Sequence, residues 1–92
     1  MFERTAIIAS TSGLHARPAT VFVEAANEYD GLDITIGREE EPADEAMDAT
    51  SVLSLMSLGL EYGDRVILRT EGTGSEQALD RLVGLLETNH DA

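Results

Sequence analysis

The sequence predicts an α+β fold in which helices cover one face of an antiparallel sheet. Segments with strand character and segments with helical periodicity follow one another in the order β-α-β-(β)-α-β-α. In a parallel sheet, strands and full crossover helices would alternate strictly, and in this sequence they do not. Each helical segment has one apolar stripe that a sheet must cover. The 92 residues suffice for one modest core. We therefore expect a single domain over residues 1–92, with a flexible tail over 88–92.

The first half of the chain contains two expected strands and one long helix. Residues 4–9 are apolar and β-branched, which favours a strand, and a polar loop with a glycine follows over 10–13. The next apolar residues recur at helical spacing. Pro18 falls in the first turn of this segment, where a helix tolerates proline. Residues 32–36 alternate with a period of two, which indicates a half-buried strand.

An acidic turn region is expected over residues 39–48, with a short edge strand whose limits the sequence does not set. A short helix should follow, with Ser51 as its N-cap and Gly59 as its stop. Val52, Leu55 and Met56 share one side of this helix. We expect Leu55 to point inward and Leu53 outward.

The last third of the chain predicts a strand and a final helix. Residues 65–69 have the composition of a strand. Thr73 and Glu76 have the spacing of a capping box, in which each side chain binds a backbone N–H of the other residue. The following apolar residues repeat at i, i+3, i+4 and i+7. They are Leu79, Leu82, Val83 and Leu86.

The charge balance excludes several classes of partner. The chain has 18 acidic residues against 6 basic ones, a net charge of −12, and every basic residue is an arginine. Such a surface repels phosphate backbones and anionic lipid, so we expect neither nucleic-acid nor membrane binding. High salt would screen its self-repulsion, which suggests a halophilic source. An acidic protein from a non-halophile is the alternative.

Cysteine is absent, which excludes disulfides and thiolate sites and fits a reducing compartment. No apolar run approaches the roughly 20 residues that a membrane span needs. The N-terminus is charged at once, unlike a signal peptide. We therefore expect a cytoplasmic protein.

The chemically suggestive segment is the start of the first helix, at His15 and Arg17. His15 falls between a glycine loop and a helix start, beside unpaired backbone N–H groups and the positive end of the helix dipole. That place binds phosphate, and it disfavours imidazolium, so the ring is expected to be neutral and nucleophilic near pH 7. Arg17 can offer charge-assisted hydrogen bonds to phosphate oxygens. By these residues alone, a surface histidine beside a surface arginine is an equally good interpretation.

Two separate motifs resemble one known family. The segment GLHARPAT (residues 13–20) resembles the phosphorylation-site signature of HPr, the histidine phosphocarrier of the phosphoenolpyruvate-dependent sugar phosphotransferase system. The segment SVLSLMSLG (residues 51–59) resembles the second signature of that family. The spacing between them also fits, with a small insertion in the acidic turn, and the resemblance covers essentially the whole chain.

The resemblance implies a fold, a site and partners. The fold would be the HPr-like open-faced β-sandwich, a four-stranded antiparallel sheet covered on one face by three helices (βαββαβα). His15 would be phosphorylated on a ring nitrogen, Arg17 would stabilise the phosphate, and Ser51 would match the regulatory serine. The donor would be enzyme I and the acceptor a sugar-specific EIIA-type protein. The chain would be a monomeric carrier, not an enzyme, and would itself need no metal or cofactor.

Other expectations from the resemblance are more open. Val52, Leu53 and Met56 could form a docking patch beside His15, although core packing of a short helix is the alternative. Ser51 could serve as a bare N-cap instead of a regulated site. Lysines that often surround the docking face in the family are missing, so partners would rely more on apolar contact or would dock in high salt. The carrier could also feed a dihydroxyacetone kinase or a nitrogen-type relay, or the domain could be a regulatory interaction module.

Overall fold

The computed structural model describes residues 1–11, 13, 14, 16–29 and 31–88, without the side chain of Ala16. The strands are β1 (Phe2–Ile7), β2 (Thr35–Arg38), β3 (Met47–Asp48) and β4 (Arg65–Thr70). The helices are α1 (Ala16–Asn27), the short 3-10 helix η1 (Ala43–Glu45), α2 (Val52–Ser57) and α3 (Ser75–Leu86).

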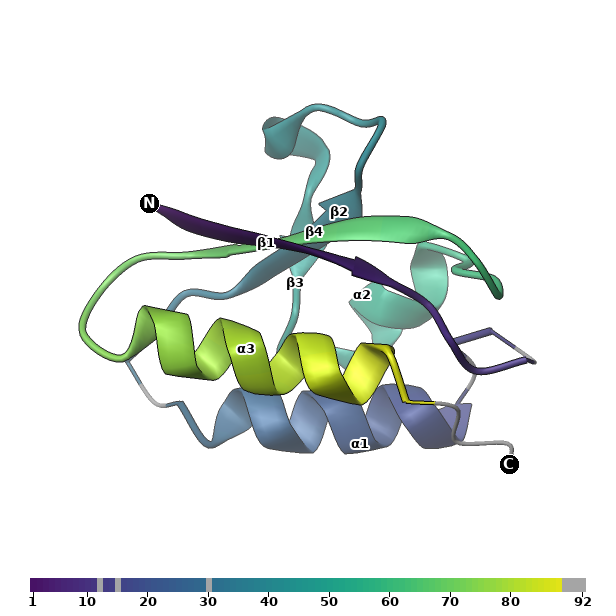
Figure 1. Cartoon of the computed structure of the whole chain (residues 1–92), viewed down its shortest axis with the longest axis horizontal. Helices are drawn as coiled ribbons and strands as arrows, with labels where there is room; N and C mark the ends of the chain where they lie inside the picture. Colours follow the sequence, from purple (N-terminus) through teal and green to yellow (C-terminus); the bar gives the residue numbers. More distant parts are fainter. Residues whose placement is uncertain (12, 15, 30, 89–92) are drawn as a thin grey trace.

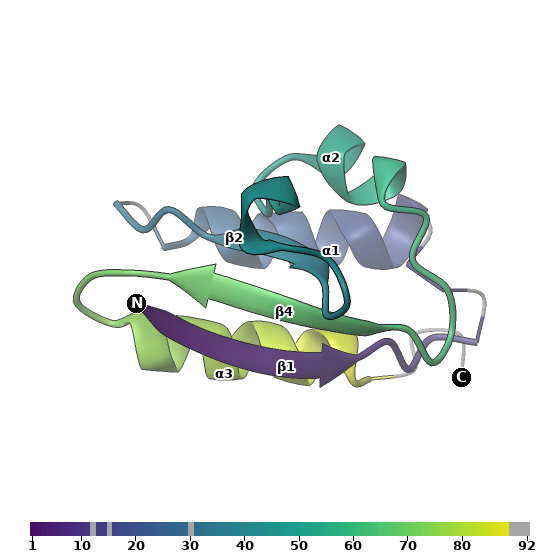
Figure 2. The same cartoon turned by 90° about the horizontal axis from the view of Figure 1, so that it is seen from above.

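The four strands form one sheet in the order β1-β4-β2-β3, and every neighbouring pair is antiparallel. Helices α1 and α3 lie side by side under the sheet in Figure 1, and Figure 2 looks onto the sheet from its other face. Helix α2 lies against α1 and β3, near the β3 edge. This arrangement confirms the α+β fold with an open-faced sheet.

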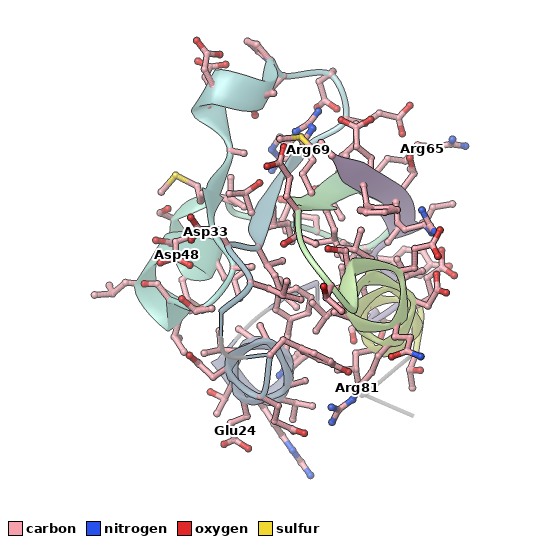
Figure 3. The ribbon with its side chains drawn as sticks, turned by 90° about the vertical axis from the view of Figure 1, so that its left-hand side faces the viewer. Glu24, Asp33, Asp48, Arg65, Arg69 and Arg81 are labelled. Atoms are coloured by element: carbon pink, nitrogen blue, oxygen red, sulfur yellow. The ribbon has the colours of Figure 1, made fainter. Side chains whose placement is uncertain are left out.

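The core lies between the sheet and the helices. Alternate strand residues face the helices and are buried, as the period-two pattern requires. From the strands these are Ala6, Ile36, Val66 and Leu68, joined by Ile34 directly before β2, and from α1 and α3 they are Ala19, Phe22, Ala25, Ala26, Ala78, Leu79, Leu82 and Leu86. The opposite face of the sheet carries both polar and apolar side chains, among them the exposed Ile7. Figure 3 shows Arg65 and Arg69 on the side away from Arg81 and Glu24.

The acidic turn region contains both η1 and β3. Strand β3 pairs with the first half of β2, which confirms a short edge strand in this region. Residues between these strands fold back over Gly37, where an added Cβ would lie 3.3 Å from the Ala46 Cα. The segment between β2 and β3 therefore covers part of the sheet face that the helices leave open.

Two strand boundaries differ from the sequence prediction. The first strand runs from Phe2 to Ile7 instead of 4–9, because its ladder with β4 ends at Ile7. The amides of Ile8 and Ala9 instead bind the carbonyls of Asp64 and Leu86, outside the sheet. The second strand begins at Thr35 instead of residue 32, because Thr35 is its first residue paired with β4 and β3. The apolar alternation begins before the ladder, where the Ile34 carbonyl accepts a hydrogen bond from the Ala49 amide at 3.0 Å.

The predicted capping box at Thr73 and Glu76 is wrong. Helix α3 begins at Ser75, and its N-cap is Gly74, with φ +85° and no side-chain hydrogen bond. The Ser75 hydroxyl donates to the Gly72 carbonyl at 2.7 Å and closes a turn before the helix. The left-handed glycine ends the loop one residue later than the capping-box spacing requires. The predicted apolar stripe is otherwise present, with Val83 half-buried beside three buried leucines.

Helix α3 ends at Leu86, and Thr88 is still attached to it through its hydroxyl, which donates to the Gly84 carbonyl at 2.7 Å. The rest of the expected tail, residues 89–92, lies outside the described residues. Among the helices that the structure describes, none has the length and apolarity to cross a membrane.

Candidate functional site

His15 lies outside the described residues, so its surroundings are defined by its neighbours along the chain. Leu14 precedes it and is buried, and α1 begins directly after it at Ala16. We call residues 8–15 the β1–α1 loop.

Gly13 lies in close contact with the segment at Leu60 and Glu61. Its φ is +77°, which only glycine adopts readily. An added Cβ would lie 2.6 Å from the Leu60 carbonyl oxygen and 3.0 Å from the Glu61 Cα. Its amide donates to the Ser10 carbonyl at 2.8 Å and closes a turn. Glycine is therefore required here for both its backbone conformation and its missing side chain.

Residues 60–64, which we call the clamp loop, hold the β1–α1 loop at both ends. The Leu14 amide donates to the Leu60 carbonyl at 2.9 Å. At the other end, the Ile8 amide donates to the Asp64 carbonyl at 2.9 Å, and the Gly63 amide donates to the Ile8 carbonyl at 2.8 Å. These backbone bonds extend the pairing of β1 beyond the sheet.

The end of α3 holds the β1–α1 loop from another side. The Ala9 amide donates to the Leu86 carbonyl at 3.0 Å, which satisfies one of the carbonyls that a helix end leaves free. The Ser10 hydroxyl, in a nearly buried side chain, donates to the Thr88 carbonyl at 3.5 Å. The loop before His15 is thus anchored on two sides.

Arg17 is exposed in the first turn of α1. Within the described part of the chain, no carboxylate lies within 4 Å of its guanidinium, and the first turn of α1 contains no acidic residue. By contrast, Arg4, Arg38, Arg69 and Arg81 each pair with at least one described carboxylate. A guanidinium that pairs with no described carboxylate, at the positive end of a 12-residue helix, can bind a phosphoryl group.

Helix α2 has the predicted cap. The Ser51 hydroxyl accepts from the Ser54 amide at 3.3 Å, which confirms Ser51 as the N-cap. The helix ends at Ser57, with Leu58 as its C-cap and Gly59 at φ +61° directly after it. The stop at Gly59 is therefore confirmed as well.

The apolar residues of α2 are divided between core and solvent. Leu55 is fully buried and Leu53 is 82% exposed, which confirms the expected split. Met56, predicted on the same side as Leu55, is 44% exposed, and Val52 is half-buried against the core. Since Met56 follows Leu55 directly, it is turned about 100° away around the helix. Leu53 and Met56 thus leave apolar surface in water on the helix that packs against α1.

Comparison with known proteins gives a consistent result. A family model described as the PTS HPr component phosphorylation site matches residues 2–88. The chain belongs to the HPr family. A phosphocarrier protein HPr of Haloferax volcanii is 43% identical over 86 residues, covering 94% of this chain and 93% of the relative. One of Vibrio cholerae is 36% identical over 90 residues, covering 98% of this chain and all of the relative.

Solved HPr structures have the same fold. A crystal structure of HPr from Bacillus anthracis superposes with a TM-score of 0.81 at 30% identity, covering 92% of this chain and 95% of that one. A structure of HPr from Thermoanaerobacter tengcongensis superposes with a TM-score of 0.80 at 38% identity, covering 95% and 92%. The chain is a phosphocarrier of the phosphotransferase system and not an enzyme.

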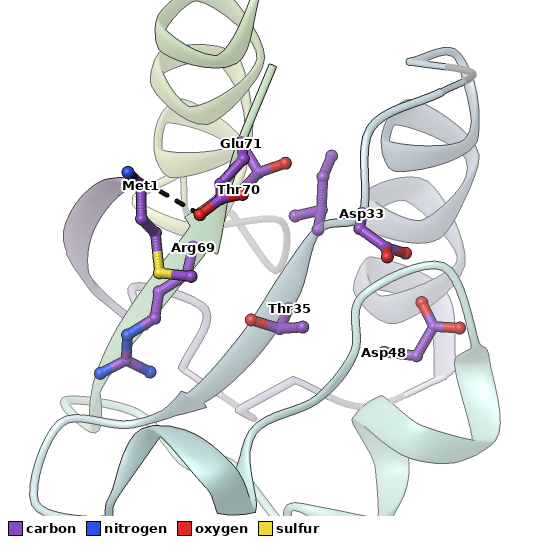
Figure 4. A pocket seen from close by; sticks show the side chains of 8 residues that line it. Met1, Asp33, Thr35, Asp48, Arg69, Thr70 and Glu71 are labelled. Carbon is purple, nitrogen blue, oxygen red and sulfur yellow. Dashed lines mark ion pairs between the residues drawn. The ribbon is translucent and has the colours of Figure 1, made fainter.

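A cavity of about 430 Å³ lies elsewhere in this HPr fold, between the end of β4 and the segment entering β2 (Figure 4). The N-terminal amine of Met1 lies 3.9 Å from a carboxylate oxygen of Glu71 at its rim. Figure 1 places the start of β1 and the start of α1 at opposite ends of the molecule, so this cavity is remote from the β1–α1 loop. Among the described residues, no group of three or more histidine and carboxylate side chains is placed to hold a metal.

Sequence reasoning found the glycine loop, Arg17 and the α2 helix, but it missed the clamp loop. Leu60 and Asp64 contribute through backbone carbonyls to residues about 50 positions earlier. Carbonyl bonds of this kind depend on the chain path and not on side-chain type. The glycine at position 13 was the only signal of a close approach, and it does not identify the partner.

Proposed function

We propose that His15 accepts a phosphoryl group from an enzyme I-type donor and passes it to a histidine of a sugar-specific EIIA-type acceptor. The observation that supports this most directly is the anchoring of Gly13 and Leu14 on Leu60. Leu14 directly precedes His15 in the chain, α1 begins at Ala16, and the family model that matches residues 2–88 is described by its phosphorylation site.

The transfer exchanges one P–N bond for another. A neutral ring nitrogen of His15 attacks the phosphorus of the donor phosphohistidine, and the donor imidazole leaves with the electron pair of the broken bond. Transfer to the acceptor repeats the step with His15 as the leaving group. Arg17 and the N–H groups at the start of α1 bind the phosphoryl oxygens, so the protein contributes positioning and charge stabilisation.

Docking of both partners is proposed to use the exposed part of α2. Leu53 and Met56 supply the apolar surface, and Val52 supplies its half-buried base. Ser51 lies at the rim of this patch as the N-cap. A negative charge at Ser51, by phosphorylation or substitution, should therefore weaken docking without unfolding the helix.

The site of action is proposed to be a cytoplasm of high salt, where the chain works as a monomeric single domain. The support is the net charge of −12 and the identity shared with the HPr of Haloferax volcanii. A surface of this charge is screened at high ionic strength.

A mixing experiment tests the route. The purified protein is incubated with enzyme I, Mg²⁺ and phosphoenolpyruvate, and then with one acceptor at a time. We expect phosphate on this chain and its transfer to the sugar-specific acceptor. Transfer only to a dihydroxyacetone kinase subunit or a nitrogen-type acceptor would replace the sugar route. Phosphorylation without transfer to any acceptor would indicate a regulatory module.

A further inference from the structure

We propose that Arg38, on β2, is a positioning residue for phosphoryl transfer at His15. It acts by fixing the clamp loop, which in turn fixes the β1–α1 loop. This inference rests on the proposed function, because it concerns the rate of that transfer. Within the described part of the chain, the hydrogen bonds and ion pairs of Arg38 reach neither Leu14 nor Arg17.

The Arg38 guanidinium binds both ends of the segment that contains the clamp loop. One terminal nitrogen donates to the carbonyls of Leu58 and Gly59, at 2.8 and 3.0 Å. The other terminal nitrogen donates to the Asp64 carboxylate at 3.0 Å. Leu58 is the C-cap of α2, so these bonds also satisfy carbonyls that the helix end leaves without partners.

Asp64 closes the clamp loop on itself. The same carboxylate oxygen that accepts from Arg38 accepts from the Glu61 amide at 2.7 Å. This amide hydrogen bond and the nearby guanidinium hold the pKa of Asp64 below its ordinary value. The Asp64 amide donates to the Glu61 carbonyl at 3.0 Å, which completes a turn. The ionised carboxylate is therefore part of the folded geometry of the clamp loop.

Every remaining step toward His15 is a backbone contact. The Leu60 carbonyl, in the clamp loop that Arg38 binds, accepts from the Leu14 amide and makes the closest approach to Gly13. Leu14 is the residue directly before His15. A shift of the clamp loop therefore moves the Leu60 carbonyl, and the chain must move with it, because Gly13 has no free space on that side.

Arginine is suited to this role because of its shape. Its planar fork donates in two directions at once, here to two carbonyls and one carboxylate, whereas lysine offers a single ammonium. The Arg38 side chain is 24% exposed, so its bonds are partly shielded from water. Transfer rates are sensitive to displacements of about 1 Å at the reacting groups. The hydrogen bonds of Arg38 can therefore affect the rate of phosphoryl transfer well beyond their contribution to folding stability.

The test compares Arg38→Gln and Arg38→Lys with wild type in the donor reaction. We expect Arg38→Gln to lower the rate at saturating protein concentration about tenfold, with a smaller change in KM. Arg38→Lys should recover only part of the rate. Arg81→Gln is the matched control, since it removes the same charge and an arginine that binds both carboxylate oxygens of Glu28, at 2.9 and 3.0 Å.

A second measurement tests the effect of the Arg38 hydrogen bonds on the β1–α1 loop and needs no partner protein. Amide hydrogen exchange at Leu14, which is bonded to Leu60, should become faster in Arg38→Gln while the amides of β4 stay protected. Should Arg38→Gln fold poorly, Asp64→Asn removes the charged acceptor and keeps the side-chain size. Its Leu14 exchange should also be faster.

The outcomes are separable. Wild-type transfer rates and unchanged Leu14 exchange in Arg38→Gln would overturn the inference. So would an equal loss of rate in Arg38→Gln and Arg81→Gln. Failure of wild-type protein to be phosphorylated on His15 would overturn the proposed function instead. The exchange experiment would still test whether Arg38 fixes the clamp loop and, through it, Leu14.

Discussion

At Gly13, one added methyl group should lower the free energy of unfolding for two separable reasons. An alanine at φ +77° costs about 1 kcal/mol in backbone strain. The clash of its Cβ with the Leu60 carbonyl should add about 1–3 kcal/mol. Gly31→Ala is the control, because Gly31 has φ +92° and open space around an added Cβ. Thermal unfolding should show Gly13→Ala as clearly less stable than Gly31→Ala, and equal losses would contradict the close approach.

Arg17 is expected to serve the phosphorylated state and not the fold. Arg17→Ala should slow transfer and leave the melting temperature nearly unchanged, because the exposed guanidinium has no carboxylate partner among the described residues. Transfer rate and melting temperature are measured in one buffer. Arg65→Ala, at an exposed site on β4, is the matched control. A large loss of stability with unchanged transfer would reverse the assignment.

Residue-scale prediction from sequence succeeded where a side chain acts locally. Ser51 as N-cap, Leu55 inside and Leu53 outside all follow from positions within one helix. Arg38 was not identified as a functional residue, because its three acceptors lie 20 to 26 positions away along the chain. His15 lies outside the described residues, so its assignment remains a proposal.

A negative charge at the N-cap of α2 should weaken partner docking more than it lowers the stability of the fold. An aspartate caps a helix as well as serine does and interacts favourably with the dipole. It would, however, place a charge at the rim of an apolar contact, where desolvation is costly. Ser51→Asp should therefore raise KM in the donor reaction with a nearly unchanged melting temperature.

Ser51→Asn is the control for that experiment, because it keeps an N-cap oxygen without the charge. It should behave like wild type. If Ser51→Asp is phosphorylated as readily as wild type at every protein concentration, α2 is not part of the docking surface.

The clamp loop predicts a specific pH dependence. The pKa of Asp64 is lower in the folded state than its ordinary value of 3.8, through the Glu61 amide first and Arg38 second. The unfolded chain therefore binds the proton first as the pH falls, and the stability that Asp64 contributes is complete above that ordinary value and lost below it. Wild type should be more stable than Asp64→Asn near neutral pH, and the difference should shrink as the pH falls through the folded pKa. A difference independent of pH would contradict an ionised Asp64.

The order and type of the elements were predictable because each has a period and a stop signal of its own. The boundaries of β1 and β2 were not, because the pairing partners in β4 decide where each ladder ends. The start of α3 was also misplaced, because the left-handed Gly74 sets the end of the preceding loop. Local patterns give an element, and the neighbouring strands or turns set its limits.

At the scale of the whole molecule, the net charge of −12 predicts that stability rises with salt. Added ions screen the mutual repulsion of the carboxylates. They also weaken ion pairs such as Glu28–Arg81, but exposed pairs contribute little to the free energy of unfolding. Unfolding in dilute and in multimolar potassium chloride should show a more stable protein at high salt. The salt effect should shrink at a pH low enough to protonate the carboxylates, and equal stability at both salt concentrations would contradict the repulsion argument.

His15 is proposed to carry the phosphoryl group, and mapping the phosphate on the protein distinguishes it from every other residue. Wild type and His15→Ala are incubated with enzyme I, Mg²⁺ and phosphoenolpyruvate, and acid-labile phosphate is located by peptide mapping at neutral to alkaline pH. His90 is the only other histidine in the chain, so His90→Ala is the matched control. We predict one acid-labile phosphate, on His15, present in wild type and in His90→Ala and absent from His15→Ala. Full labelling of His15→Ala would contradict the account.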